Sequence, residues 1–386
     1  MRITSGPSSR WAAAVAAGLA TALLLTACAG GPANGNDKSA SAAKVAEAQS
    51  ILDQLIKPLE FHAPGPAFDV GTKAQGKKLY FISAALGYEF TQNVLKGMQA
   101  AADKVGMTIV ALDAKGDTST ASRQIQQAIS QDAAAIAIMS FSAESLAAPL
   151  RDAKAAGIPV VDVFDGDPGL PTAKQAEIGV VGKASYCYTC FGKQLAAMAV
   201  AQSKGKVNAA LVGVPDTPAA VLESEGFKSE LKRLCPSCKV KEYGSSTAQW
   251  GTEVPSIGTA IGQDPSFNFV VPVFAILGDL MKPSLLAAGA EKRLSIVTVN
   301  ASKTTMADLR NKELITGIVG SPEVWMGWAT MDQVLRVMTG QPAAVDSKVE
   351  NRAFTSANLE DANPDTGAVY GDVDFAAEYL KLWGLG

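Results

Sequence analysis

Two kinds of apolar pattern alternate along most of the chain. Short runs such as residues 79–82 are continuously apolar, which is typical of parallel strands that are buried on both faces. The stretch that follows places Phe90, Val94, Met98 and Ala102 at helical spacing. A strand, a loop at its carboxyl end and a helix form half of a βαβ unit, and ligands bind outside such strand ends in open α/β sheets.

Repeats of this unit predict an α/β fold. A single open sheet with so many strands is uncommon, so we expect two similar lobes, each a parallel sheet covered by helices. The pattern predicts strands at 79–82, 108–112, 134–139, 160–164, 178–181, 207–214, 239–243, 269–275, 296–300 and 315–319. It predicts helices at 91–105, 120–131 and 143–156 in the first half of this region, and at 219–234 in the second.

The first 28 residues have the pattern of an export signal. Arg2 and Arg10 precede an apolar run over residues 11–25, and the run ends in Leu-Thr-Ala-Cys at Cys28. This ending resembles a lipobox, in which Cys28 is acylated and becomes the mature amino terminus. The alternatives are an ordinary cleaved signal and a membrane anchor, although the run is short for a membrane span. We therefore expect a lipoprotein signal over residues 1–28.

Residues 29–75 are expected to lie outside the two lobes. Residues 29–43 are mostly Gly, Ala, Ser, Asn and Pro, a composition typical of a flexible tether. Apolar residues at helical spacing over 45–59 predict an extra helix that packs on the first domain. The sequence His-Ala-Pro-Gly-Pro at 62–66 ends it.

The charged and catalytic residue types exclude several functions. A net charge of -3 without basic clusters argues against a nucleic-acid partner. His62 is the one histidine, so a catalytic triad or a histidine metal centre lacks members. A calcium-binding loop could be suggested by the closely spaced Asp162, Asp165 and Asp167. The twelve-residue ligand pattern of such loops is absent, so a solvated turn at the end of a strand fits better. We expect no catalysis, no cofactor and no metal.

Four cysteines form two Cys-x-x-Cys pairs, Cys187 with Cys190 and Cys235 with Cys238. Such spacing can bind zinc, but an exported chain favours disulfides. The first pair is expected to open a helix near the ligand-binding edge. The second follows the helix at 219–234, which carries the chain about 20 Å away from that edge. Two local disulfides are therefore expected, with a redox role as a more remote alternative.

The chain resembles a known family over residues 77–340, namely the sugar-type periplasmic substrate-binding proteins of ABC importers. The resemblance to ribose-binding proteins rests on short segments of the sequence. These are residues 90–97, Ala102-Asp103-Lys104-Val105-Gly106, Gly157-Ile158-Pro159-Val160-Val161, Glu225-Gly226-Phe227 and Gly340 after a long helix.

The resemblance implies two lobes that are joined by three crossings and hinged around a ligand cleft. It assigns residues 76–182 and 321–348 to the N-terminal lobe, and residues 183–320 and 349–386 to the C-terminal lobe. It also implies a small-molecule ligand and delivery to an ABC permease with its ATPase. Together with Cys28, it implies a monomer that is lipid-anchored at the extracytoplasmic face of the cell membrane.

When the pocket positions of the family are carried over to this chain, the aromatic residues are kept and most of the charged residues are replaced. Phe90 and Trp250 match ring-stacking aromatics, although core packing is the alternative for both. The other expected ligand-binding residues are Tyr88, Phe164, Asp165 and Asn300. Val221, Leu277 and Gly320 stand where the family has an arginine, an asparagine and a glutamine. The ligand is therefore expected to be a sugar, a polyol or a less polar, ring-containing solute.

The sequence alone leaves two questions undecided, namely the place of two tryptophans and the role of the protein. Trp325 and Trp328 could face either the cleft or the core. The chain could also be a ligand-responsive sensor subunit for a membrane receptor or histidine kinase. A transcriptional regulator with this core is excluded by the export signal and by the absence of a DNA-binding motif before Lys77.

Overall fold

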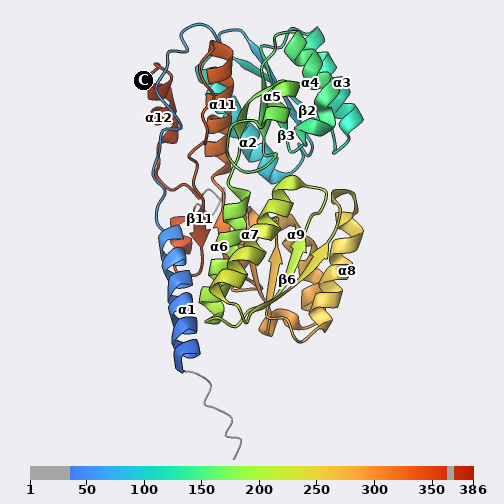
Figure 1. Ribbon diagram of the computed structural model, residues 1–386, viewed down its shortest axis with the longest axis vertical. Coiled ribbons are helices and arrows are strands. Elements are labelled where there is room, and N and C mark those ends of the chain that lie inside the picture. The colour runs from blue at the N-terminus through green and yellow to red at the C-terminus, as the bar shows by residue number, and fades with distance from the viewer. Residues whose placement is uncertain (1–34, 363–368) are drawn as a thin grey trace, which may run out of the picture.

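Two separate sheets organise the protein, one in each of two lobes stacked along the long axis (Figure 1). The computed structural model describes residues 35–362 and 369–386, with side chains from residue 41 onward. The predicted α/β architecture of two lobes with parallel sheets and covering helices is confirmed. The predicted export signal and Cys28 lie outside the described residues.

The first sheet has the strand order β2-β1-β3-β4-β5, and all neighbouring strands are parallel. Its strands have apolar side chains on both faces, because Leu79 and Phe81 pack with one core cluster and Tyr80 and Ile82 with another. The strands are β1 (Lys78–Ser83), β2 (Thr108–Asp113), β3 (Ala135–Met139), β4 (Val160–Val163) and β5 (Val180–Ala184). The helices are α2 (Glu89–Lys104), α3 (Thr118–Ser130), α4 (Ala147–Ala155), α5 (Ala173–Ile178) and α11 (Glu323–Thr339).

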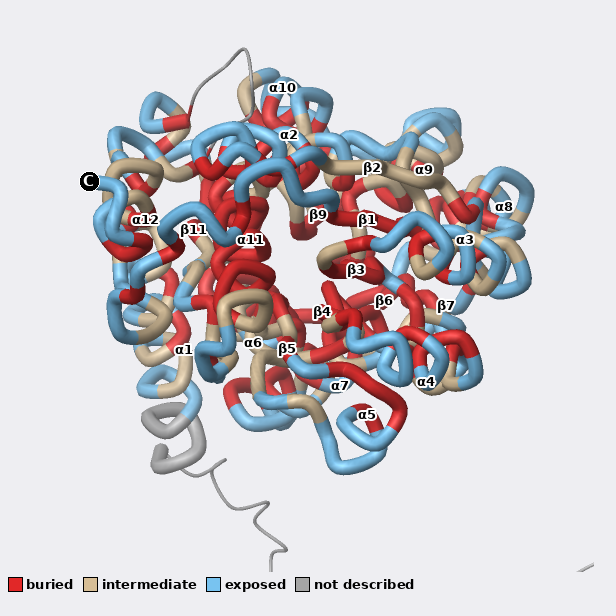
Figure 2. Tube along the Cα trace, turned by 90° about the horizontal axis from the view of Figure 1, so that it is seen from above, coloured by how far each residue is buried: buried red, intermediate tan, exposed pale blue. Residues whose placement is uncertain are grey.

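The second sheet has the strand order β11-β10-β9-β8-β6-β7, with only β11 antiparallel to its neighbour. The strands are β6 (Asn208–Gly213), β7 (Lys239–Gly244), β8 (Phe269–Pro272), β9 (Ser295–Val299), β10 (Ile315–Gly320) and β11 (Arg352–Phe354). The helices are α6 (Tyr188–Ser203), α7 (Pro218–Leu234), α8 (Trp250–Gln263), α9 (Ala275–Ala287) and α10 (Lys303–Arg310). Viewed from above, buried strands and α11 lie toward the inside and exposed segments around them (Figure 2).

The strand predicted at 178–181 is displaced. Thr172 starts helix α5 with a capping box, and the helix continues to Ile178. Gly179 ends it in the left-handed region at a φ of 113°. The strand β5 then runs on to Ala184 in the first sheet. A helix of six residues is too short for its apolar spacing to be distinguished from a strand in the sequence.

The extra helix exists, but its expected place on the first domain is wrong. Helix α1 (Gly35–Leu55) packs on α6 and α7 of the second lobe. Its Ala48 and Leu52 are buried, and Glu47 Oε1 lies 2.5 Å from Arg233 Nη1 on α7. Apolar spacing shows that one face of a helix is buried, but it does not show which lobe buries it.

Residues 57–65 cross from the second lobe to the first. At one end, the Ile56 carbonyl accepts a 3.1 Å hydrogen bond from Arg352 Nε in β11. At the other, the Pro66 carbonyl accepts a 3.1 Å hydrogen bond from Arg336 Nη2 in α11. The chain therefore ties the two lobes together before the first sheet begins.

Helix α12 (Phe375–Leu382) departs from the expected assignment of residues 349–386 to the second lobe. Strand β11 does belong to that lobe, but α12 packs beside α11 of the first lobe (Figure 1). The Phe68 amide donates to the Leu382 carbonyl at 2.8 Å, and the Val70 amide to the Trp383 carbonyl at 3.1 Å. The end of the chain returns to the first lobe because its apolar side chains are buried there.

Trp325 and Trp328 belong to the core rather than to the cleft. Trp325 stacks on Phe375 with ring centroids 5.2 Å apart, and Trp328 stacks on Trp383 at 5.6 Å. Each of these two tryptophans is at most 3% exposed. The same region holds a buried ion pair between Asp332 and Arg336 at 2.7 Å, and the Trp383 indole donates to Asp332 Oδ1 at 2.8 Å.

Both predicted cysteine pairs form disulfides in the structure. Cys187 is the residue before α6, near the crossing between the lobes, and Cys235 directly follows α7. The predicted placement of the two pairs at the beginning of one helix and the end of another is thus confirmed.

We predict that Asp332→Ala lowers the free energy of unfolding by about 3 kcal/mol or more, because it leaves the Arg336 guanidinium buried without its counter-ion. Urea unfolding followed by circular dichroism measures this. The matched control is Glu47→Ala in the exposed pair with Arg233, which should lower the free energy of unfolding far less, because solvent screens this pair. Equal losses for the two variants would contradict the importance of the buried pair.

Candidate ligand-binding site

Side chains at the carboxyl ends of the strands bring the two lobes into contact. Tyr88 follows β1 and precedes α2, whereas Trp250 begins α8 after β7. Their ring centroids are 6.1 Å apart, and Trp250 also contacts Phe274 at 6.3 Å. Trp250 is 8% exposed, and its Nε1 has no hydrogen-bond partner among the described residues. We call Tyr88, Trp250 and Phe274 the tryptophan group.

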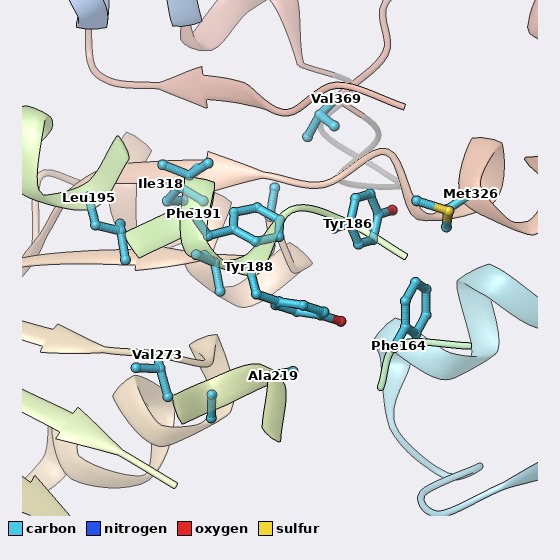
Figure 3. Close-up of a cluster of buried hydrophobic side chains, with 14 of the residues drawn as sticks. Phe164, Tyr186, Tyr188, Phe191, Leu195, Ala219, Val273, Ile318, Met326 and Val369 are labelled. Carbon is cyan, nitrogen blue, oxygen red and sulfur yellow. The ribbon is translucent and has the colours of Figure 1, made fainter. Parts of the chain in front are cut away.

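A second set of rings, Phe90, Phe164, Tyr186, Tyr188 and Phe191, lies around the first crossing between the lobes. We call it the phenylalanine–tyrosine group. Phe164 contacts Phe90 at 5.3 Å and stacks on Tyr186 at 5.5 Å. Tyr186 and Tyr188 each contact Phe191 in α6. In Figure 3 the hydroxyl of Tyr188 is directed toward Phe164 of the first lobe.

The backbone at Phe164 supports a special role for this ring. Its φ is 68°, in the left-handed region that non-glycine residues rarely adopt. The Phe164 amide still donates to the Ala184 carbonyl at 3.1 Å, so the neighbouring strand end holds the residue in place. Such a conformation turns the chain sharply at the end of β4, and backbone strain of this kind is concentrated at functional sites.

In the structure, the two aromatic residues that were expected to stack on the two sides of the ligand belong to different groups of rings. Phe90 belongs to the phenylalanine–tyrosine group and Trp250 to the tryptophan group. Phe90 is half-buried, and Tyr88 is 44% exposed. Phe90 lies in the first turn of α2 and Trp250 begins α8, each in a helix that follows a strand end. A ligand held between these two rings remains a prediction.

Asp165 is already hydrogen-bonded within the first lobe. Its Oδ2 accepts from the Ala143 amide at 3.1 Å and from Gln175 Nε2 at 3.4 Å. Burial is the main cause that raises the pKa of Asp165 to about 6. Asp162 on β4 is fully buried, and its pKa is raised well above the ordinary value by burial and then by Asp165. Its Oδ1 has no partner among the described residues.

Asn300 lies at the second crossing, where β9 and β10 end. Its φ is 64°, and its amide donates to the Val319 carbonyl at 3.1 Å. Its side-chain Oδ1 accepts a 3.4 Å hydrogen bond from Ser321. Nearby on α11, Glu323 accepts a 2.7 Å hydrogen bond from Asn93, and burial raises the pKa of Glu323 to about 7. The crossing therefore holds polar groups from both lobes.

The three positions at which this chain lacks a polar or charged pocket residue of the family lie in different surroundings. Leu277 is fully buried in the core. Gly320 ends β10, where a side chain would meet Val369. Val221 is 37% exposed and lines a separate surface cavity on the second lobe, together with Lys228 and Glu242.

Sequence reasoning missed several residues of the region, namely Tyr186, Tyr188, Glu223, Phe274 and Glu323. Glu223 is 1% exposed on α7, and both its carboxylate oxygens lack a partner among the described residues. The spacing of Ala220, Glu223, Phe227 and Leu234 places Glu223 on the apolar face of its helix. That position is a signal by which Glu223 could have been found.

The described residues have the chemistry of a binding site. Within 35–362 and 369–386, no group of three or more His, Cys, Asp or Glu side chains is placed to hold a metal ion. None of the helices in this part of the chain is long and apolar enough to cross a bilayer. The rings offer apolar contact, and the buried polar groups can orient a solute.

Comparisons with known proteins agree with this arrangement. The family model of the periplasmic binding protein domain matches residues 79–342. The ribose import binding protein of Bacillus subtilis (strain 168) is 27% identical over 146 residues, which cover 37% of this chain and 45% of that protein. The match thus spans less than half the length of this relative.

Two solved structures show the same fold. An ABC sugar transporter subunit from Rhodobacter sphaeroides 2.4.1 is 18% identical, with a TM-score of 0.63 over 74% of this chain and 99% of that one. A 5-methylthioribose transporter solute-binding protein from Thermotoga lettingae is 17% identical, with a TM-score of 0.65 over 80% and 94%. The family model matches more than half of the length of this chain, so the chain belongs to the periplasmic binding protein domain family.

Proposed function

We propose that this protein is a lipid-anchored solute-binding protein that captures a small molecule between its lobes and delivers it to an ABC import permease with its ATPase. The solute is a sugar, a polyol or a less polar, ring-containing molecule. The protein acts as a monomer on the extracytoplasmic face of the cell membrane, without catalysis.

One observation carries the proposal, namely that aromatic rings meet where strand ends of the two lobes face each other. Tyr88 comes from the first lobe and Trp250 from the second. The Trp250 indole nitrogen is buried and has no hydrogen-bond partner among the described residues. A ligand that fills this site would bury its ring faces on the aromatic groups and pair with the polar atoms.

The relatives support the class of solute. The Bacillus relative is described as a ribose import protein, and the Thermotoga structure contains 5-methylthioribose. The second of these ligands joins a polar ring to an apolar thioether. A site with apolar rings and few cationic side chains suits a ligand with both kinds of surface.

Delivery to a permease requires that the bound form differ in shape from the empty one. The two sheets are joined by the segments at residues 185–187, 321–322 and 340–351, and residues 57–65 and the return from β11 to α12 also connect the lobes. The lobes would turn on these segments. A ligand that contacts both lobes favours the closed arrangement, because only this arrangement lets it make both sets of contacts. The permease would recognise the closed form.

The proposed lipid anchor would hold the protein by its second lobe. Helix α1 begins at Gly35, shortly after Cys28, and lies along α6 and α7. Two acyl chains on one cysteine suffice for stable anchoring. The first lobe would then depend on the crossing segments for its position at the membrane.

A thermal-shift screen over sugars, polyols and ring-containing acids tests the function directly. A true ligand at 100 times its dissociation constant should stabilise the protein by about 2.7 kcal/mol. Failure of every solute of these classes to raise the melting temperature would contradict the proposal.

We predict that Trp250→Ala weakens binding of the best solute by about 2 kcal/mol or more, because a central aromatic anchor is lost. Titration calorimetry measures the change. Asn300→Ala should cost less and relax the preference among solutes, since Asn300 orients rather than buries the ligand.

The matched control for Trp250→Ala is Tyr243→Ala, which removes a ring of the second lobe that contacts Phe267 and Lys241 instead. This control should bind as wild type does. If Trp250→Ala also binds as tightly as wild type, Trp250 is a packing residue and not part of the site.

We also predict that Cys28→Ser releases a folded protein from the membrane fraction, because no acyl chains can then be attached. Fractionation followed by immunoblotting measures the distribution, and Cys187→Ser with Cys190→Ser serves as the control for loss of cysteines. Retention of Cys28→Ser in the membrane would refute the lipid anchor.

A further inference from the structure

The two disulfides lie at opposite ends of their helices. Cys187 is the N-cap residue of α6, and Cys190 lies in the first turn of that helix. Cys235 is the C-cap residue of α7, and Cys238 follows it before β7 begins. Both bonds close equally short loops, so a difference in loop length cannot distinguish them. The two pairs differ instead in the helix end and the atoms that surround their sulfurs.

The beginning of α6 favours a negative charge on sulfur. The first backbone amides of a helix have no partners within it, and the helix dipole is positive at this end. The Cys190 amide donates to Cys187 Sγ at 3.2 Å. After reduction of the bond, this amide can stabilise a thiolate on Cys187. A disulfide whose reduced form is stabilised in this way is reduced more readily.

One acidic side chain of the first lobe opposes this effect. Asp167 Oδ1 accepts a 3.0 Å hydrogen bond from the Thr189 amide, so a carboxylate lies at the same helix end. Lys183 brings a positive charge to the same loop, because its Nζ donates to the Asp167 carbonyl at 3.3 Å. Asp167 therefore sets how strongly the beginning of α6 stabilises a thiolate.

The surroundings of the second pair favour the intact bond. The Gly205 carbonyl oxygen lies 3.2 Å from Cys235 Sγ and 3.5 Å from Cys238 Sγ. A carbonyl oxygen disfavours a thiolate, and so does the negative end of the α7 dipole. The Val207 amide donates to Cys238 Sγ at 3.2 Å, but the carbonyl faces both sulfurs.

The cations at the end of α7 do little to change this. Its last turn contains Lys232 and Arg233. Arg233 is already paired with Glu230 at 2.6 Å and with Glu47 at 2.5 Å. Lys232 is exposed, so solvent and salt screen its charge.

We propose that the Cys187–Cys190 pair is a thiol–disulfide exchange site that takes two electrons from a dithiol, whereas Cys235–Cys238 is a structural bond. Access agrees with this division, because Cys187 and Cys190 are both partly exposed and Cys235 is only 6% exposed. The exchange is stoichiometric and needs no solute. It therefore goes beyond the proposed function and does not depend on it.

The exchange takes place in two steps. A thiolate of the dithiol attacks Cys190 Sγ, the bond between the two cysteines breaks, and Cys187 leaves as the thiolate that its helix end stabilises. The second thiol of the dithiol then loses its proton and attacks the dithiol's own sulfur in the mixed disulfide, and Cys190 leaves. The dithiol is oxidised to a disulfide. Its two electrons and, through solvent, its two protons pass to Cys187 and Cys190.

A redox titration of the full chain compares the two pairs within one molecule. The protein is equilibrated in graded mixtures of reduced and oxidised dithiothreitol or glutathione, free thiols are alkylated, and the cysteine peptides are quantified by mass spectrometry. Cys187–Cys190 should be reduced at a ratio of reductant to oxidant at least about tenfold lower than Cys235–Cys238, which is about 30 mV for a two-electron couple. Replacing both Cys235 and Cys238 by serine should leave the midpoint of the first pair unchanged.

Asp167→Asn tests whether the charge at the beginning of α6 controls the exchange. The variant keeps an oxygen for the Thr189 amide but removes the negative charge, so a thiolate on Cys187 should be stabilised further. The first pair should then be reduced at a severalfold lower ratio, and Cys187 should be alkylated at lower pH. The matched control is Asp216→Asn, which removes a carboxylate bonded to the Thr247 amide at 3.0 Å, away from α6, and should change neither value.

Two results would overturn the assignment. Reduction of both pairs at the same ratio, or of Cys235–Cys238 first, would show that the beginning of α6 does not favour exchange. An unchanged midpoint and alkylation profile in Asp167→Asn would show that charge at this helix end does not act on Cys187. Neither result bears on solute binding, which the thermal-shift screen tests separately.

Discussion

Both sheets of this protein are covered by helices, and this constraint determines where a small molecule can be recognised. Strands such as β1 are apolar on both faces, with Leu79 and Phe81 in one core and Tyr80 and Ile82 in another. Polar and aromatic groups that act on a solute must therefore project from strand ends and from the loops that follow. Tyr88, Phe164, Trp250 and Asn300 all occupy such positions. The proposed binding region is thus a consequence of how the two lobes bury their sheets.

The segments outside the two sheets link the lobes more extensively than the family pattern implies. Residues 57–65 are bonded to β11 at one end and to α11 at the other. The end of the chain returns from β11 to α12 on the first lobe. These additional connections run along one side of the molecule (Figure 1). They therefore add connections on this side to the crossings between the two sheets.

The sequence predicts local elements well and long-range partners poorly. Apolar runs identify the strands because burial on both faces leaves a continuous signal. The apolar residues at helical spacing over 45–59 correctly predicted a helix there. Their spacing could not show that α6 and α7 cover its apolar face. Phe90 and Trp250 were predicted as ring-stacking residues of the pocket, but their separation into two ring groups depends on how the lobes meet. Glu223 was overlooked because a charged residue on an apolar face looks like an interruption of the helix pattern.

The central claim is that a solute is held between the lobes by aromatic rings that come from both of them. A crystal structure of the protein grown with the solute that gives the largest thermal shift tests this most directly. The account predicts density for the solute between the lobes, with a ring or apolar face against Trp250 and polar groups within hydrogen-bond distance of Asp165 or Asn300. Density in the surface cavity beside Val221 and Lys228, with the region between the lobes empty, would contradict it.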